Sequence, residues 1–112
     1  MPYCENMAEI LRADLGAEPG LSERKMFGGL SFLLHGHMAC RVLQDRCVFR
    51  VGKARESHAL SIGAGHIGPK DRPMRGIFEL DKGAFFQAAV RHKLTEIAFS
   101  HASSLPLRNL GS

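Results

Sequence analysis

Three short runs of alternating residues, joined by very short links, restrict the fold of this chain more than any other feature. The runs span Leu30–Leu34, Met38–Val42 and Cys47–Val51. A period of two predicts β-strands, and links as short as residues 35–37 and 44–45 join antiparallel neighbours. We therefore expect a β-meander, preceded by a shorter strand at about residues 23–27 and followed by a strand at Gly76–Leu80.

Two other segments have helical spacing. Tyr3–Leu15 carries one apolar face and ends at Gly16. Lys82–Ser103 follows Asp81, a good N-cap, and Pro106 stops it. Its apolar stripe comprises Phe86, Val90, Leu94, Ile97 and His101. Between the meander and the last strand we expect a short helix at Lys53–Leu60 and a loop at Ser61–Arg72, and after Pro106 a tail at residues 107–112.

These elements predict an α+β fold, in which the two longer helices cover one face of an antiparallel sheet. The other face is either solvated or paired with a second copy of the chain. The 112 residues fit a single domain over 1–112, with its core at about residues 3–105.

The composition limits the expected cellular compartment and the expected class of ligand. The chain has no signal-peptide pattern and no apolar stretch of about 20 residues, so we expect a cytoplasmic protein that does not span a membrane. Its three cysteines are then reduced thiols. The net charge of +4 could attract nucleic acid or an anionic ligand. Alternatively, the basic residues form a solvated face without a specific partner.

No catalytic constellation is evident. The cysteines at 40 and 47 fall on strand positions that read as core, without a His and Asp or Asn arrangement nearby in the sequence. Paired carboxylates are also absent as a pattern. His35 and His37 flank a glycine in a predicted turn, and their spacing is not that of a typical zinc site. We therefore expect no enzyme activity, no metal and no cofactor.

Two segments are candidates for binding. Gly28 and Gly29 stand between strand-like runs, where they permit a tight turn or bulge, or alternatively a backbone cradle for an anion with Lys25 beside it. Arg72 and Arg75 flank Pro73 and could bind a carboxylate or phosphate, although pairing with surface carboxylates such as Glu23, Glu56 or Asp71 is favoured. Arg50, on a strand face, is either paired or part of a small basic cleft with Lys25 and Arg72.

Four blocks together resemble the TfoX N-terminal domain (TfoX/Sxy) family over about residues 3–105. They are Arg24–Phe32 with its Lys-Met-Phe-Gly-Gly core, Gly36–Cys40, Phe49–Gly52 and Arg72–Gly76. The resemblance implies a secretion-chaperone-like α+β fold, no enzyme activity, and a link to regulation of competence for DNA uptake. Two-domain members carry a helical second domain and act beside the cyclic-AMP receptor protein. Since the sequence ends at Ser112, we expect a stand-alone member.

Three functions follow as hypotheses. The first is a regulatory domain that binds a protein partner, such as a transcription regulator or a second copy of the chain, through the open sheet face or an edge strand. The second is an anion- or nucleotide-binding module, in which Lys25, Arg50, Arg72 and Arg75 converge around the Gly28–Gly29 turn. The third is direct nucleic-acid binding, which the scarcity of aromatic residues for base stacking disfavours.

Overall fold

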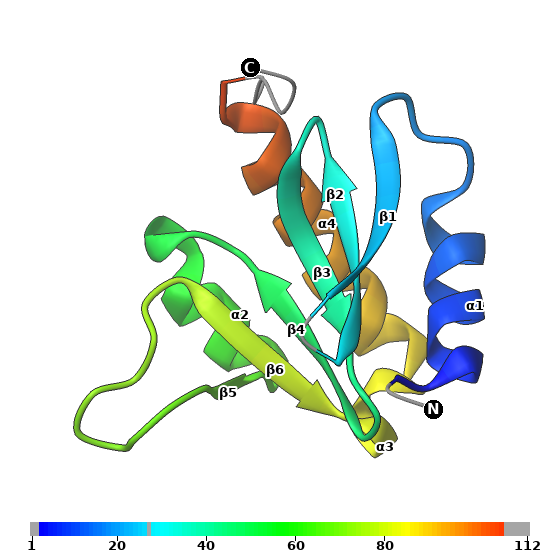
Figure 1. Ribbon diagram of the computed structural model, residues 1–112. Helices are drawn as coiled ribbons and strands as arrows, with labels where there is room; N and C mark the ends of the chain where they lie inside the picture. Colours follow the sequence, from blue (N-terminus) through cyan, green and yellow to red (C-terminus); the bar gives the residue numbers. More distant parts are fainter. Residues whose placement is uncertain (1–2, 27, 107–112) are drawn as a thin grey trace.

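The computed structural model describes residues 3–26 and 28–106. Within them the chain forms one antiparallel sheet of six strands in the order β1-β2-β3-β4-β6-β5 (Figure 1). The strands are β1 (Leu21–Met26), β2 (Gly29–Leu34), β3 (His37–Val42), β4 (Arg46–Arg50), β5 (Gly65–His66) and β6 (Ile77–Asp81). The helices are α1 (Glu5–Leu15), the 3-10 helix η1 (Lys53–Arg55), α2 (Glu56–Ile62), α3 (Lys82–Phe85) and α4 (Ala88–Ser104).

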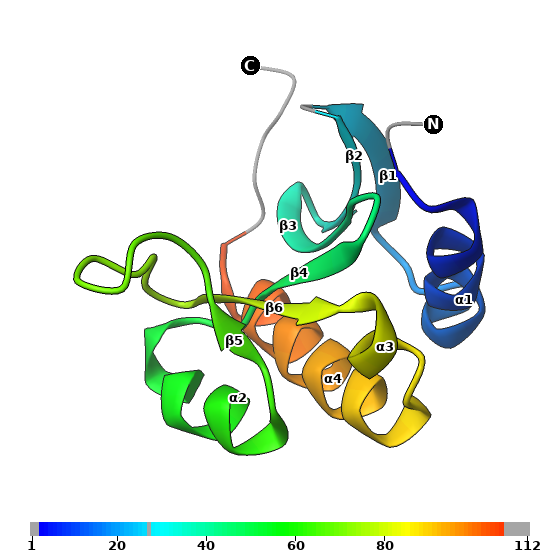
Figure 2. The ribbon, with the colours of Figure 1, turned by 90° about the horizontal axis from the view of Figure 1, so that it is seen from below.

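The core lies between one face of the sheet and the helices. A row of paired residues, Phe32, Cys40, Phe49 and Phe78, crosses β2, β3, β4 and β6, and all four are fully buried. Helix α4 lies along this face, with α1 at one flank and α2 at the other (Figure 2). Helix α1 is joined to the edge strand β1 by an ion pair between Arg12 and Glu23 at 2.8 Å. The predicted α+β fold is confirmed.

The period-two runs correspond to strands β2, β3, β4 and β6, as predicted. Strand β1 begins two residues earlier than expected, at Leu21, and the predicted end at Phe27 lies outside the described residues. Asp81 is the N-cap of the segment after β6, because its Oδ1 accepts a hydrogen bond from the Ala84 N–H at 2.8 Å. The predicted tail at residues 107–112 also lies outside the described residues.

The prediction of one long helix over Lys82–Ser103 is wrong. The helix breaks into α3 and α4 at Gln87, whose backbone is extended. The guanidinium of Arg91 donates a hydrogen bond to the carbonyl of Phe85 at 3.0 Å, replacing a bond that a continuous helix would supply. The break buries Phe85 completely and leaves Phe86, which the stripe placed in the core, 41% exposed.

The predicted loop Ser61–Arg72 is also more ordered than expected. The preceding helix is split into η1 and α2, and α2 extends to Ile62. Strand β5 then pairs with β6 at the edge of the sheet. Only two residues of β5 form this pairing, so the glycine-rich composition hid a strand too short to show a period.

The strands β3 and β4 separate at one end. Their pairing covers only Cys40–Val42 of β3 and Cys47–Phe49 of β4. Beyond it, β4 leads through Val51 and Gly52 into η1, and the end of α4 lies beside this turn (Figure 1). The candidate functional site lies where these two strands separate.

Candidate functional site

A basic groove runs between the η1–α2 segment and helix α4. It consists of three adjoining cavities with volumes of about 430, 230 and 240 Å³. The first two share Gly52, Lys53 and His101, and the last two share Arg55, Ile97 and Ser100. The cationic or titratable basic side chains along the groove are Arg50, Lys53, Arg55, His58, Arg75, Lys93 and His101.

Carboxylates are scarce in this groove. Among the described residues that line it, Glu96 in the cavity beside α2 is the single acidic side chain. The ion pairs of the described residues leave Arg50 and Lys53 without a carboxylate partner. The floor is partly apolar, with Val51, Ile97 and Ile77 among the lining residues. The groove therefore suits a ligand that is both anionic and partly apolar.

Two glycines lie in the cavity with the largest volume of the three, which we call the Gly52 notch and define by Arg50, Gly52, Lys53, Gly76 and His101. The N–H groups of Val51 and Gly52 both donate to the Gly76 carbonyl, at 2.9 and 3.1 Å. Gly52 has φ +86°, and a Cβ there would lie 2.6 Å from His101 Nδ1. The notch therefore needs glycine at residue 52, both for its backbone and for the close imidazole.

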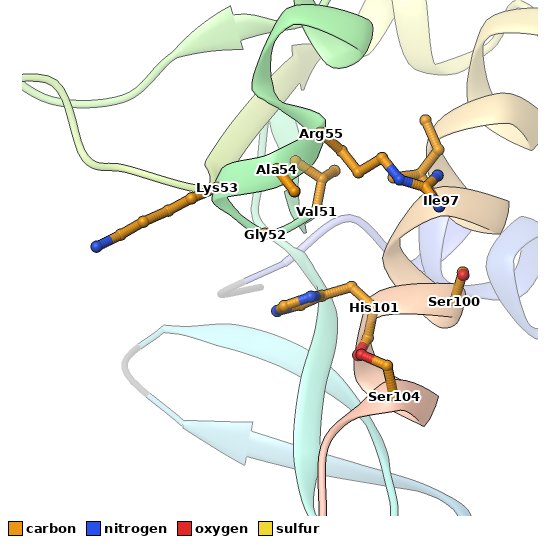
Figure 3. Close-up of a pocket in the computed structure, with 9 residues that line it drawn as sticks. All are labelled: Val51, Gly52, Lys53, Ala54, Arg55, Ile97, Ser100, His101 and Ser104. Carbon is orange, nitrogen blue, oxygen red and sulfur yellow. The ribbon is translucent and has the colours of Figure 1, made fainter.

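Figure 3 shows how the side chains beside the notch lie. The His101 ring extends from α4 beneath Gly52, and the Arg55 guanidinium lies beside Ile97. Lys53 extends outward, away from the cavity floor. Its flexible ammonium group can therefore turn toward a ligand that enters from outside.

Arg75 is bound to a carboxylate. Its Nη2 lies 2.8 Å from Oε1 of Glu56, and its Nε donates to the same carboxylate at 3.0 Å. Oε2 of Glu56 also accepts the Gly76 N–H at 2.6 Å. The Arg75 guanidinium and this N–H lower the pKa of Glu56. Arg75 thus ties α2 to the start of β6, and the favoured surface pairing of Arg75 is confirmed.

His101 lies in an environment that disfavours its charged form. Partial burial lowers the pKa of His101 from its ordinary value of 6.5, and the positive charges of Arg50 and His37 lower it further. The cationic groups of β3, β4 and α4 are therefore close enough to repel one another. An anion in the notch would relieve this repulsion.

The structure brings together only part of the predicted cluster. Arg50 and Arg75 line the same cavity. Lys25 lies on β1, three strands from β4 and so about 14 Å away across the sheet, and its ammonium stands 5.9 Å from the centre of the Tyr3 ring. Arg72 is exposed in the segment before β6 and is not among the residues lining that cavity. The expected convergence of four basic side chains is therefore not observed.

The Gly28–Gly29 break is a tight junction, as its structural interpretation predicted. Gly28 has φ +75° in the turn between β1 and β2. Gly29 pairs with Met26, and a Cβ on it would lie 2.9 Å from the Val42 carbonyl oxygen. The two glycines thus serve a turn and a close approach of β2 to β3.

Sequence reasoning missed Lys53, His101 and the glycine pair of the notch. A Gly-Lys step directly after a strand was a usable signal for Gly52 and Lys53. No comparable signal marks His101, because its role depends on where α4 ends in space. Three of the four blocks that carry the family resemblance meet near the notch, through His37, Gly52 and Gly76.

The cysteine thiols and possible metal ligands were the other candidates for a functional site. Cys40 and Cys47 are fully buried free thiols, as their strand positions predicted, and burial raises the pKa of both. Within residues 3–26 and 28–106, no three His, Cys, Asp or Glu side chains form a group that could hold a metal ion. No helix in the same ranges is long and apolar enough to cross a membrane.

Comparison with known proteins identifies the family of the chain. The profile of the TfoX N-terminal domain family matches residues 13–96, which include Arg50, Lys53 and Arg75 but not His101. Searches of curated proteins and of solved structures found no match. Because the matched segment covers most of the 112 residues, the chain belongs to the TfoX N-terminal domain family.

Proposed function

We propose that this chain is a non-catalytic regulatory domain whose basic groove binds an acidic segment of a protein partner. The observation that carries the proposal is the row of basic side chains along three adjoining cavities, with Glu96 as the single carboxylate among the described lining residues. A transcription regulator is the partner class that the family favours.

The lining of the groove favours protein over nucleic acid. Val51, Ile97, Ile77 and Leu105 give it an apolar floor, which suits the mixed acidic and apolar side chains of a peptide. Apart from histidines, the described lining residues include no aromatic ring on which a base could stack. Direct nucleic-acid binding therefore remains the second candidate.

Site-specific photo-crosslinking tests this proposal. A photoreactive amino acid replaces Ala54, which is exposed and lines the groove, and in a matched control it replaces Ala13, which is exposed on α1. Neither substitution removes a charge. We expect a protein adduct in the cell of origin from residue 54 and not from residue 13, with the crosslink mapping to an acidic segment.

Charge reversal provides the second arm. Lys53→Glu combined with Arg55→Glu is expected to remove the adduct from residue 54, since both side chains line the groove. Equal adduct yields at residues 54 and 13, or an adduct that survives charge reversal, would contradict the proposal. An adduct with nucleic acid alone would support the second candidate.

A further inference from the structure

The Gly52 notch concentrates positive charge that the described residues do not neutralise. Arg50 and Lys53 line it without a carboxylate partner, and His101 adds a third charge when it is protonated. Glu56, which contacts Gly76 beside the notch, is occupied by Arg75 and by the Gly76 N–H. A single carboxylate ligand would leave part of this charge uncompensated, whereas a dianion would match it.

The notch is fixed by the backbone rather than formed by mobile side chains alone. A Cβ on Gly76, which has φ +76°, would lie 3.1 Å from the carbonyl carbon of Gly52. The imidazole of His101 fills the space where a Cβ on Gly52 would stand. Strand β4, the segment before β6 and helix α4 therefore place Arg50, Arg75 and His101 around one cavity, and Lys53 of η1 extends outward beside it.

The size of the notch matches a small ligand. Its cavity has a volume of about 430 Å³ and opens into the neighbouring cavity of about 230 Å³. Small-molecule sites have volumes of about 300–1,000 Å³. The neighbouring cavity offers Ala54, Ile97 and the hydroxyl groups of Ser100 and Ser104 to the rest of such a molecule.

We propose that the Gly52 notch binds the phosphate group of a small phosphorylated metabolite, with Arg50, Lys53 and the imidazole of His101 as its ligands. A phosphate monoester carries a charge of about −1.5 to −2 at neutral pH. Arg50 presents the planar fork that binds two phosphate oxygens at once, and Lys53 adds a compact charge. The notch is one end of the basic groove, so the phosphate is a second ligand of that groove, and its binding does not require that the protein partner bind there.

A titration followed by two-dimensional ¹H–¹⁵N NMR tests the site. Inorganic phosphate and glycerol 3-phosphate are each added to the full chain, with sodium chloride at matched ionic strength as the reference. We expect saturable shifts of the amides of Gly52, Lys53 and Gly76, with tighter binding of the ester. Shifts that rise linearly without saturation, or that chloride reproduces, would overturn the proposal.

Two variants separate a specific site from general charge attraction. Arg50→Gln is expected to weaken phosphate binding by about tenfold or more, because it removes a charge-assisted fork. Lys93→Gln makes the same change of charge at the other end of the groove and is expected to weaken binding less than about threefold. Equal weakening by the two variants would refute a localised site. If the unmodified chain does not bind phosphate but the adduct at residue 54 still forms, this inference is refuted and the proposed function is not.

Sulfate tests the role of His101, because it stays a dianion while the histidine titrates. Its binding is expected to tighten by about fivefold between about pH 8 and about pH 5.5 as His101 gains a proton. The charged groups that face His101 are His37 of β3, Arg50 of β4, and Lys53 and Arg75 beside the notch. His101→Gln should remove the tightening and His37→Gln should retain it. The reverse pattern would exclude His101 as a ligand.

Discussion

Replacement of Arg91 by methionine is expected to destabilise the fold by about 3 kcal/mol. The side chains of Arg91 and Asp14 are 9% and 15% exposed, and Nε of Arg91 lies 2.6 Å from Oδ2 of Asp14. Methionine preserves much of the packing of the Arg91 stem but leaves the Asp14 carboxylate without its main partner. Removing one partner of a buried ion pair costs about 3–5 kcal/mol. The lower value applies because Asp14 is exposed as a whole residue although its side chain is mostly covered, and because its carboxylate keeps a contact with His92 at 3.2 Å.

Urea denaturation followed by circular dichroism measures this effect. With a slope of about 2 kcal/mol per molar urea, the unfolding midpoint should fall by about 1.5 M. Arg12→Met is the matched control, because the side chains of Arg12 and Glu23 are 39% and 35% exposed and such pairs contribute about 0.2–1 kcal/mol. A loss below about 1 kcal/mol for Arg91→Met, or one equal to the control, would refute the claim that this pair holds α1 to α4.

Two further perturbations address the notch and the core. Gly52→Ala should cost about 1–3 kcal/mol of folding free energy and abolish the phosphate-induced shifts, because its φ of +86° is strained for alanine and the new Cβ meets His101. Gly65→Ala, with nothing within 4 Å, is the control, and equal effects of the two would contradict this account. Stability should fall as pH rises above about 9, by about 1.4 kcal/mol per pH unit for each thiol, because Cys40 and Cys47 stay protonated in the fold but ionise when unfolded. In urea titrations at several pH values, Cys47→Ala should remove about half of this slope, and an unchanged slope would count against it.

Local patterns were sufficient for most of the elements. The apolar runs of β2, β3 and β4 identify these strands in their own sequence, although burial does not alternate along them: all six residues of β2 and the three central residues of β4 are buried. The N-cap at Asp81 and the Gly28 turn likewise depend on chemistry within a few residues. Such features are predictable because cause and effect lie in the same short segment.

The helix break at Gln87 was not predictable in this way. The stripe through Phe86 is a valid helical pattern, and only the packed structure shows that Phe85 is buried instead. The Arg91 side chain that bonds the Phe85 carbonyl is itself held by Asp14, 77 residues earlier in the chain. Tertiary contacts therefore outweighed local periodicity.

The candidate site also combines residues that the sequence could predict with residues that only the tertiary structure identifies. Arg50 and Arg75 could be selected as cations near glycines, and they do line one cavity, whereas Lys25 could be excluded only by the strand order. By itself the sequence determined most of the strands, the first helix, the buried thiols and the family, because these follow from residue type and spacing. The tertiary structure decided which charges meet, because the divergence of β3 and β4 brings the end of α4, with His101, against Gly52. That encounter depends on the path of the whole chain, which no local pattern records.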